Sequence, residues 1–227
     1  AMEYLPLANR VQEGDLLSSP IDVAGRKVVI IGGGDTGADC LGTAHRQGAE
    51  SIHQFEIMPR PPDQRAESTP WPTWPLMFRT ASAHEEGGDR VFSVNTERFL
   101  DDGNGHVRAL LAHEVQMIDG RFEKVEGSDF ELEADFVFLS MGFTGPESDW
   151  ITTQFGVELD ARSNVARNHD YATNVDGVFV AGDMGRGQSL IVWAIAEGRA
   201  AAASVDRYLM GSTDLPSPVE PTAVGLR

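Results

Sequence analysis

The chain has 227 residues, of which 41% are hydrophobic, and this length and composition suit one large or two small globular domains. Its 35 acidic and 18 basic residues give a formal charge of −17, which would repel a nucleic-acid backbone or an anionic membrane surface. We find no run of about 18 apolar residues and no charged-then-apolar leader, so we expect neither a membrane span nor a secretion signal. These features predict a cytoplasmic protein.

A lead-in over residues 1–22 opens the chain. Its first ten residues carry apolar positions that could form a short helix or an irregular arm, and the polar stretch after them ends at Pro20. The first domain is therefore expected to begin near residue 23, where the chain turns into an apolar strand that starts at Val28.

That strand runs directly into a glycine-rich turn with the pattern G-x-G-x-x-G. The residues of the turn are Gly32, Gly33, Gly34, Asp35, Thr36 and Gly37. In this pattern the first glycine permits a tight turn, the second lets a pyrophosphate approach the backbone, and the third allows close packing of helix on strand. A strand before the turn and a helical pattern after it predict a dinucleotide-binding unit, whose helix N-terminus faces the phosphates.

The helix that follows the turn is expected over residues 36–47, with a capping box from Thr36 to Asp39 and a stop at Gly48. Cys40 lies in this helix among small apolar residues, which is typical of a buried structural thiol. It is the only cysteine in the sequence. A single thiol excludes an intrachain disulfide, a Cys-x-x-Cys redox centre and an iron–sulfur cluster held by this chain alone.

A second strand over residues 51–57 carries Glu56, about twenty residues after the turn, where a carboxylate can accept both ribose hydroxyls of NAD. Three arginines could instead favour NADP, because Arg46, Arg60 and Arg65 could hold its 2′-phosphate through charge-assisted hydrogen bonds. Alternatively, Glu56 and the arginines form a solvated rim. The sequence thus supports a nicotinamide dinucleotide and leaves NADH and NADPH open.

A proline-rich segment over residues 59–75 contains Trp71-Pro72-Thr73-Trp74-Pro75, a composition that excludes a regular helix or a central strand. Its tryptophans could pack over a cofactor or partner, or pin the loop to its own domain. Between residues 91 and 133, alternating segments broken by Asp-Gly turns predict an antiparallel meander. The apolar segment 134–141 is a buried strand that would close the first domain at residue 141.

The second domain is expected over residues 142–210. An apolar strand over 175–183 ends in Gly182 and Asp183, and after a short loop a helix is expected over 188–208. Asp183 would lie at the carboxyl end of the strand, near N–H donors at Gln188 and Ser189. Alternatively, Asp183 serves as a turn or cap residue. A loose tail is expected over 211–227.

These segments together resemble the two-dinucleotide-binding-domain flavoproteins, and within them the glutamate synthase small (beta) subunit family. The most discriminating matches are the Pro-Trp-Pro loop and the run from Gly187 to Ile195, while the glycine turn is common to many flavoproteins. Residues 141–147, Met-Gly-Phe-Thr-Gly-Pro-Glu, also match. The resemblance covers nearly the whole chain.

The resemblance implies an α/β fold: a Rossmann-like nicotinamide domain, with a parallel sheet and an antiparallel β-meander, plus the C-terminal part of an FAD-binding domain. It implies that Gly182 and Asp183 contact FAD, and that Gln188 and Ser189 lie where the last helix approaches the flavin. Gly142 is expected to be a further cofactor-binding residue. The family's other glycine turn and its cysteine clusters for iron–sulfur centres are not in this sequence. We therefore expect a fragment that binds FAD weakly or not at all and is inactive alone, with iron–sulfur clusters only in a preceding part.

The function that the resemblance implies is hydride transfer from NAD(P)H to FAD, which supplies electrons to a large subunit or domain that makes glutamate from glutamine and 2-oxoglutarate. Alternatives are a reductase of the same architecture with another acceptor, and a nucleotide-binding module without turnover. The cofactors would carry the chemistry, so no catalytic acid or base is proposed. The six histidines show no metal-ligand spacing and are expected to be structural or solvated.

Overall fold

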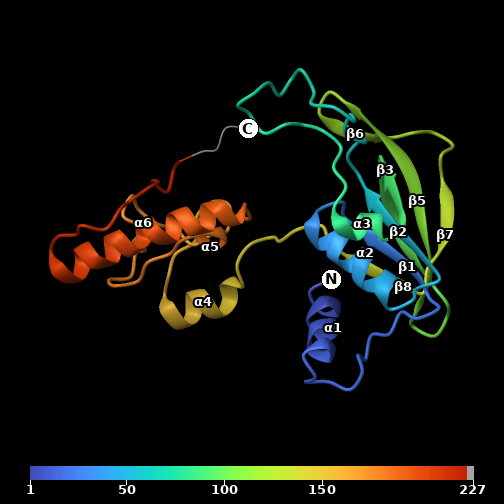
Figure 1. Ribbon diagram of the computed structural model, residues 1–227, viewed down its shortest axis with the longest axis horizontal. Coiled ribbons are helices and arrows are strands. Elements are labelled where there is room, and N and C mark those ends of the chain that lie inside the picture. Colours follow the sequence, from blue (N-terminus) through green and yellow to red (C-terminus); the bar gives the residue numbers. More distant parts are fainter. Residues whose placement is uncertain (224–227) are drawn as a thin grey trace. The chain divides into compact units, whose positions relative to one another are not determined.

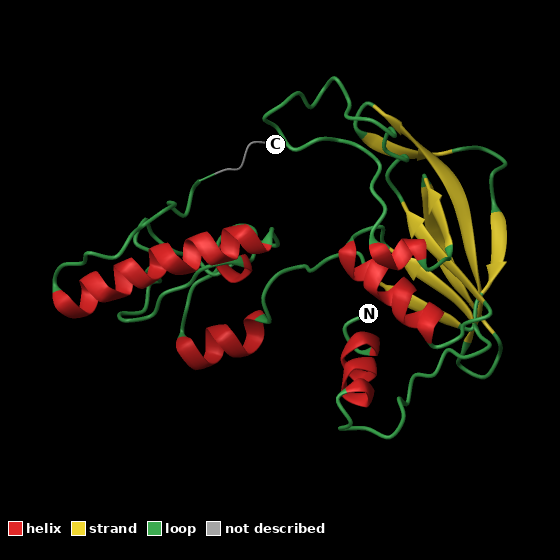
Figure 2. Cartoon of the chain, viewed as in Figure 1, coloured by secondary structure: helices red, strands yellow, loops and turns green. Residues whose placement is uncertain are grey.

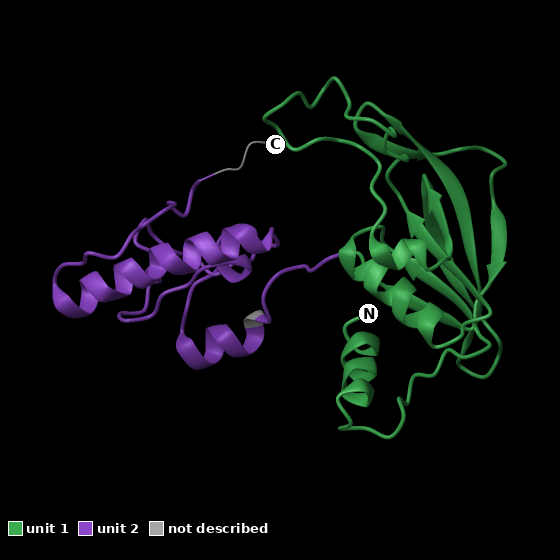
Figure 3. Ribbon diagram, in the orientation of Figure 1, with its two compact units in different colours: residues 1–141, 227 green, residues 142–226 purple. Residues whose placement is uncertain are grey.

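The computed structural model describes residues 1–223, which divide into two compact units (Figure 3). The first unit runs from Ala1 to Met141, and the second begins at Gly142. Within the described residues, no helix has both the length and the apolar character needed to cross a membrane.

The first unit is built on a four-stranded parallel sheet with the order β3-β2-β1-β8 (Figure 1). Its strands are β1 (Lys27–Ile31), β2 (Ser51–Glu56), β3 (Asp89–Phe92) and β8 (Phe136–Leu139), and its helices are α1 (Tyr4–Gln12), α2 (Asp35–Arg46) and α3 (Ser82–Glu85). Strand β1 lies in the interior of the sheet, so the glycine turn at its carboxyl end has a strand on each side.

An antiparallel sheet is inserted between β3 and β8 in the sequence. It contains β4 (Val94–Asp101), β5 (Val107–Ile118), β6 (Arg121–Lys124) and β7 (Phe130–Glu133). The long strand β5 pairs with β4 on one edge, and with β6 and β7 at different points of the other. The meander expected from the Asp-Gly turns is therefore present.

The parallel sheet buries both of its faces, which explains its nearly continuous apolar strands. Val28 and Ile30 pack with Leu41 of α2 in one core, whereas Val29 packs with Leu110 of β5 in another. Figure 2 shows the helices of this unit on one side of the parallel sheet and the antiparallel strands on the other. Because side chains alternate along a strand, one short segment supplies both cores.

The second unit consists of α4 (Ser148–Phe155), α5 (Asp183–Arg186), α6 (Ile191–Met210) and the turns that connect them. Small alanines of α6 pack against Tyr171, and a separate core lies beneath α4. Helix α6 ends at Gly211, whose positive φ of 81° suits the left-handed cap that glycine adopts without strain.

The prediction of a strand over residues 175–183 is wrong. This segment makes only the isolated bridge between Ala172 and Phe179. Hydrogen bonds from Thr173 N–H to the Val178 carbonyl and from Val180 N–H to the Tyr171 carbonyl make it the returning arm of a tight turn. A strand needs continuous pairing with neighbours, and hydrophobicity alone does not provide it.

The ends of two expected helices also need correction. Helix α6 begins at Ile191 after the extended residue Leu190, so Gln188 and Ser189 precede it. The capping box of α2 is absent, because the N-cap residue is Gly34 and Thr36 lies inside the helix. Before α6 begins, the residues Asp183–Arg186 form α5, which is a single helical turn.

A buried charge cluster connects the elements of the second unit. The Glu197 side chain of α6 is fully buried, and its carboxylate accepts two hydrogen bonds from Arg167, one from Arg186 and one from the Gly182 N–H. Burial acts to raise the pKa of Glu197, but the hydrogen bonds from Arg167, Gly182 and Arg186 outweigh it and lower that pKa. The same arginines donate to the carbonyls of residues 221 and 223, which fixes part of the tail.

We predict that Glu197→Gln lowers the stability of the second unit by about 3–5 kcal/mol, because it leaves two buried guanidinium groups without a counter-charge. Glu158→Gln, at an exposed position, is the matched control and should change stability by less than about 0.5 kcal/mol. Hydrogen exchange of the α6 amides measures the effect. Equal protection in both variants would contradict the structural role of the cluster.

The cluster also predicts a pH dependence. Since the folded pKa of Glu197 lies below its ordinary value of 4.5, its contribution is complete above that pH and is lost as the pH falls below it. The α6 amides of the unsubstituted chain should lose protection over this acidic range more steeply than those of Glu197→Gln. Parallel curves would show that another group controls acid unfolding.

Candidate functional site

The glycine turn is shaped by close backbone approaches at the carboxyl end of β1. Gly32 has a φ of 125°, and a Cβ there would overlap the Ser140 carbonyl. A Cβ on Gly37 would overlap the Gly32 carbonyl and the amide of Gln54. By contrast, a Cβ on Gly34 would meet nothing within 4 Å. The first and third glycines are thus required by packing, while the second borders open space at the start of α2.

A buried glutamine stabilises the turn through a hydrogen bond. Gln54 of β2 is only 1% exposed, and its Nε2 donates to the Gly32 carbonyl at 2.9 Å. Its Oε1 lies 2.8 Å from Nε2 of His84. Because Nδ1 of His84 accepts from the Ala81 N–H, we assign the ring proton to Nε2, which donates to Gln54. Burial, and then the charge of Arg90, lowers the pKa of His84 and favours this neutral form.

Glu56 occupies the last position of β2, beside the turn. Its Oε2 accepts the Gly33 N–H at 2.9 Å, and its Oε1 accepts the Met58 N–H at 2.9 Å. These bonds hold the carboxylate in one orientation. Since each carboxylate oxygen can accept a further hydrogen bond, Glu56 can still receive two hydroxyl donors from a ligand.

A cavity of about 560 Å³ opens in front of the turn and Glu56. Its lining includes Gly33, Gly34, Asp35, Ala38, Glu56, residues 58–62, residues 76–79, Ala81, His84, Arg90 and Phe92. This volume falls within the range of small-molecule and cofactor sites. The long proline-rich loop therefore supplies one wall of the cavity.

Three arginines give this cavity a positive wall. The guanidinium carbons of Arg60 and Arg90 lie 4.1 and 4.6 Å from the centre of the Phe78 ring. Arg79, the third, stacks on Trp74 at 4.2 Å. Burial, and then the charge of Arg60, lowers the pKa of Arg90, which shows that the two cations share one region. Such a wall suits an anionic group, because guanidinium groups bind phosphate through paired hydrogen bonds.

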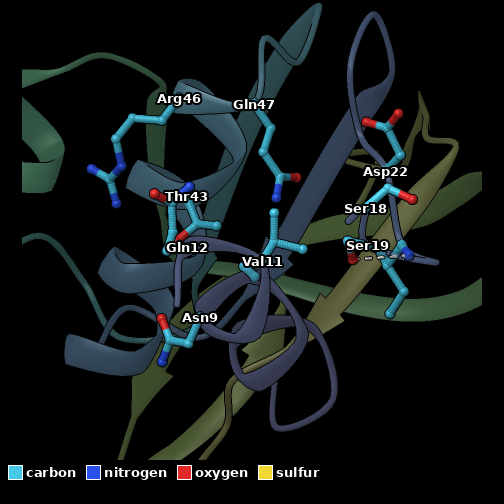
Figure 4. Close-up of a pocket in the computed structure, with 11 residues that line it drawn as sticks. Asn9, Val11, Gln12, Ser18, Ser19, Asp22, Thr43, Arg46 and Gln47 are labelled. Atoms are coloured by element: carbon cyan, nitrogen blue, oxygen red, sulfur yellow. Dashed lines mark hydrogen bonds between the residues drawn. The ribbon is translucent and has the colours of Figure 1, made fainter. Parts of the chain in front are cut away.

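Two of the arginines singled out in the sequence lie elsewhere. Arg65 donates to the carbonyls of Thr69 and Thr73, so it holds the proline-rich loop together. Arg46 forms an ion pair with Glu86 and lines a second cavity of about 500 Å³. Figure 4 shows Arg46 in this second cavity, which also receives polar side chains from α1 and from the segment after it.

The candidate residues of the second unit form two contacts. Gln188 Oε1 accepts the Phe143 N–H at 3.1 Å, and a Cβ on Gly142 would overlap that oxygen. Asp183 Oδ1 accepts both the N–H and the hydroxyl of Ser189 at 3.1 Å. The Asp183 carboxylate therefore stabilises the loop between α5 and α6.

Sequence reasoning missed Gln54, His84, Arg79 and Arg90. A glutamine within the predicted strand segment Ser51-Ile52-His53-Gln54-Phe55 was a usable signal, since an uncharged polar side chain in a buried strand needs a partner. Nothing local marked Arg79 or Arg90. They reach the cavity only because the loop folds back and β3 pairs with β2.

Comparisons with known proteins define the class of this chain. Residues 89–198 match the family described as pyridine nucleotide-disulphide oxidoreductase. The solved structure of T. acidophilum thioredoxin reductase superposes with a TM-score of 0.58 at 23% identity, covering 83% of this chain and 53% of that one. The fold of this chain is therefore similar to that of T. acidophilum thioredoxin reductase.

The particular relatives are glutamate synthase small chains. The chain is 70% identical over its full length to the NADPH glutamate synthase small chain of Mycobacterium tuberculosis, of which it covers 47%. It is 44% identical over 95% of its length to that of Bacillus subtilis, of which it covers 46%. The resemblance to this family is thus confirmed, and the chain spans about half the length of these relatives.

We predict that Gly32→Ala lowers the stability of the first unit by about 2–4 kcal/mol, combining left-handed backbone strain with overlap on the Ser140 carbonyl. Gly34→Ala is the matched control, because its site is open, and should cost less than about 1 kcal/mol. Urea unfolding followed by hydrogen exchange of β1 tests the pair. Equal losses would contradict the packing argument.

Proposed function

We propose that this chain carries the NADPH-binding domain and the C-terminal part of the FAD-binding domain of a flavin-dependent oxidoreductase. When both cofactors are bound in the complete protein, NADPH supplies a hydride and FAD accepts it. The single observation that carries the proposal is the cavity at the glycine turn, where Glu56 and three arginines lie beside the N-terminus of α2.

The turn would hold the pyrophosphate. Gly34 leaves space for it, and the N-terminal N–H groups of α2 have no side-chain cap from that residue. A helix N-terminus of this kind attracts an anion through its N–H groups and its dipole. Glu56 is positioned by Gly33 and Met58 to accept ribose hydroxyls.

NADPH is preferred over NADH in this proposal. The 2′-phosphate would contact the positive wall of Arg60, Arg79 and Arg90. Its negative charge would oppose the effects of burial and of the Arg60 charge, which lower the pKa of Arg90. Glu56 and Asp35, which also line the cavity, would repel the phosphate, but the three guanidinium groups outnumber these two carboxylates. Arg46 and Arg65, which do not line this cavity, have no phosphate contact in this proposal.

For the second unit, we propose that Gly142, Gly182, Asp183, Gln188 and Ser189 lie at the FAD site of the complete protein. Large apolar side chains at the start of α6 are exposed in this unit, including Ile191 at 75% and Val192 at 60%. This exposure supports an incomplete domain, which would bind FAD weakly or not at all in this chain alone.

The biological context is also proposed. In the full-length protein, the electrons would pass through iron–sulfur clusters in a preceding part to a large subunit or domain that makes glutamate from glutamine and 2-oxoglutarate. We place this protein in the cytoplasm. By itself, the chain should bind nucleotide without turnover. The single cysteine of this chain supplies no Cys-x-x-Cys pair for reducing a disulfide.

We predict that calorimetric titration of the chain gives tighter binding of NADPH than of NADH. Arg90→Gln should weaken NADPH binding by about 10–100-fold, as expected for loss of a charged hydrogen bond, and leave NADH binding nearly unchanged. The preference should also shrink at high salt, since phosphate contacts are screened.

Arg121→Gln is the matched control, because this exposed arginine of β6 does not line the cavity, and both affinities should stay as they are. Tighter binding of NADH would contradict the assignment and give the control of specificity to Glu56. Binding of neither nucleotide would show that this chain lacks a competent site.

A further inference from the structure

A second group of chemically active side chains lies on the antiparallel sheet of the first unit. Glu97 comes from β4, His113 from β5 and Asp129 from the loop before β7. One ligand atom from each of them lies within 4.8 Å of the others. None of these residues lines the nucleotide cavity, so the site does not depend on the proposed function.

The imidazole of His113 is the unusual member of this group. Its side chain is 9% exposed, and its Nδ1 is buried without a hydrogen-bond partner. The nearest carboxylate oxygen, Oε2 of Glu97, lies 3.6 Å away, which is too far for a hydrogen bond. A buried polar atom without a partner is costly, so this nitrogen needs an explanation.

The distance between His113 Nδ1 and Glu97 Oε2 is too long for a hydrogen bond, but it suits two ligands of one metal ion. Zn²⁺ binds histidine nitrogen and carboxylate oxygen at about 2.0–2.2 Å in a tetrahedral arrangement, which places neighbouring ligand atoms about 3.4 Å apart. The separation of Nδ1 and Oε2 is close to this value. Asp129 would supply a further oxygen, and water would complete the coordination.

The backbone places these ligands independently of any ion. Glu97 lies at a bulge, because the pairing of β4 with β5 shifts between Thr96 and Arg98. Bulges bend a strand and redirect its side chains. The loop before Asp129 is fixed by Ser128, whose hydroxyl accepts the Glu114 N–H at 3.0 Å and donates to the Val125 carbonyl.

A cation already occupies this position. The Lys124 ammonium lies 3.5 Å from Glu97 and 2.5 Å from Asp129, and its side chain is 36% exposed. Its contacts mark where the two carboxylates concentrate negative charge. Because the lysine stem is long and reaches solvent, the ammonium can leave without disturbing the strands.

We propose that Glu97, His113 and Asp129 bind one divalent transition-metal ion, with Zn²⁺ as the best fit, in exchange for the Lys124 ammonium. Imidazole with two carboxylates suits this class of ion, whereas Mg²⁺ and Ca²⁺ prefer oxygen ligands alone. Nδ1 would bind the metal, so the proton would move to Nε2. The Asn95 side chain, whose amide lies 3.3 Å from Nε2, would turn its oxygen to accept that proton.

The test is titration of the chain with Co²⁺, whose visible absorption reports a tetrahedral site, followed by displacement with Zn²⁺. We expect one bound ion per chain. His113→Gln and Glu97→Gln should each weaken binding by at least about 100-fold, the upper range for loss of an outer-shell partner. Lys124→Met removes the competing ammonium and keeps every ligand, so it should bind the ion more tightly.

His106→Gln is the matched control, because His106 is an exposed histidine in the turn between β4 and β5. It should leave the Co²⁺ spectrum and affinity unchanged. Absence of the tetrahedral bands in both the unsubstituted chain and Lys124→Met would overturn the proposal. Bands that persist in both ligand variants, or disappear in His106→Gln, would assign the ion to scattered surface groups and overturn it equally.

Discussion

The close approach of α2 to the carboxyl end of β1 is the constraint on which the first unit depends. A Cβ on Gly37 would overlap the Gly32 carbonyl, so glycine is needed for this close approach. The Gln54 side chain donates a hydrogen bond to the same carbonyl. This packing aims the N-terminus of α2 at the cavity and brings Gly33 to the carboxylate of Glu56. The shape of the proposed nucleotide site is therefore a consequence of backbone contact.

Electrostatics adds selectivity to that shape. The whole chain carries a formal charge of −17, yet the cavity wall gathers Arg60, Arg79 and Arg90 around aromatic rings. A local cationic wall in an acidic protein favours an anionic ligand at one place and disfavours it over the remaining surface. The aromatic contacts also limit the rotamers of these three arginines, so less side-chain freedom would be lost if a phosphate bound there.

The second unit is stabilised by a buried cluster of charged side chains. Glu197 is buried between Arg167 and Arg186, and it also accepts the N–H of Gly182 in the Gly-Asp motif. Glu197, which connects the elements of this unit, therefore lies outside the Gly182-Asp183 motif that the sequence analysis singled out. The antiparallel sheet carries a further polar cluster at Glu97, where a bulge and an anchored loop bring polar side chains from three segments together.

The sequence by itself determined the elements whose signals are local. The glycine turn, the strands on either side of it and the antiparallel meander follow from apolar periodicity and turn residues, and Glu56 was placed by its spacing from the turn. The strand expected over residues 175–183 failed because pairing partners are not encoded in a segment's own hydrophobicity. Tertiary structure alone decided which arginines reach the cavity, since Arg90 arrives through strand pairing while Arg65 turns toward its own loop. It also joined His113 to Glu97 and Asp129, because long-range contacts depend on the path of the whole chain and leave no periodic trace in the residues that make them.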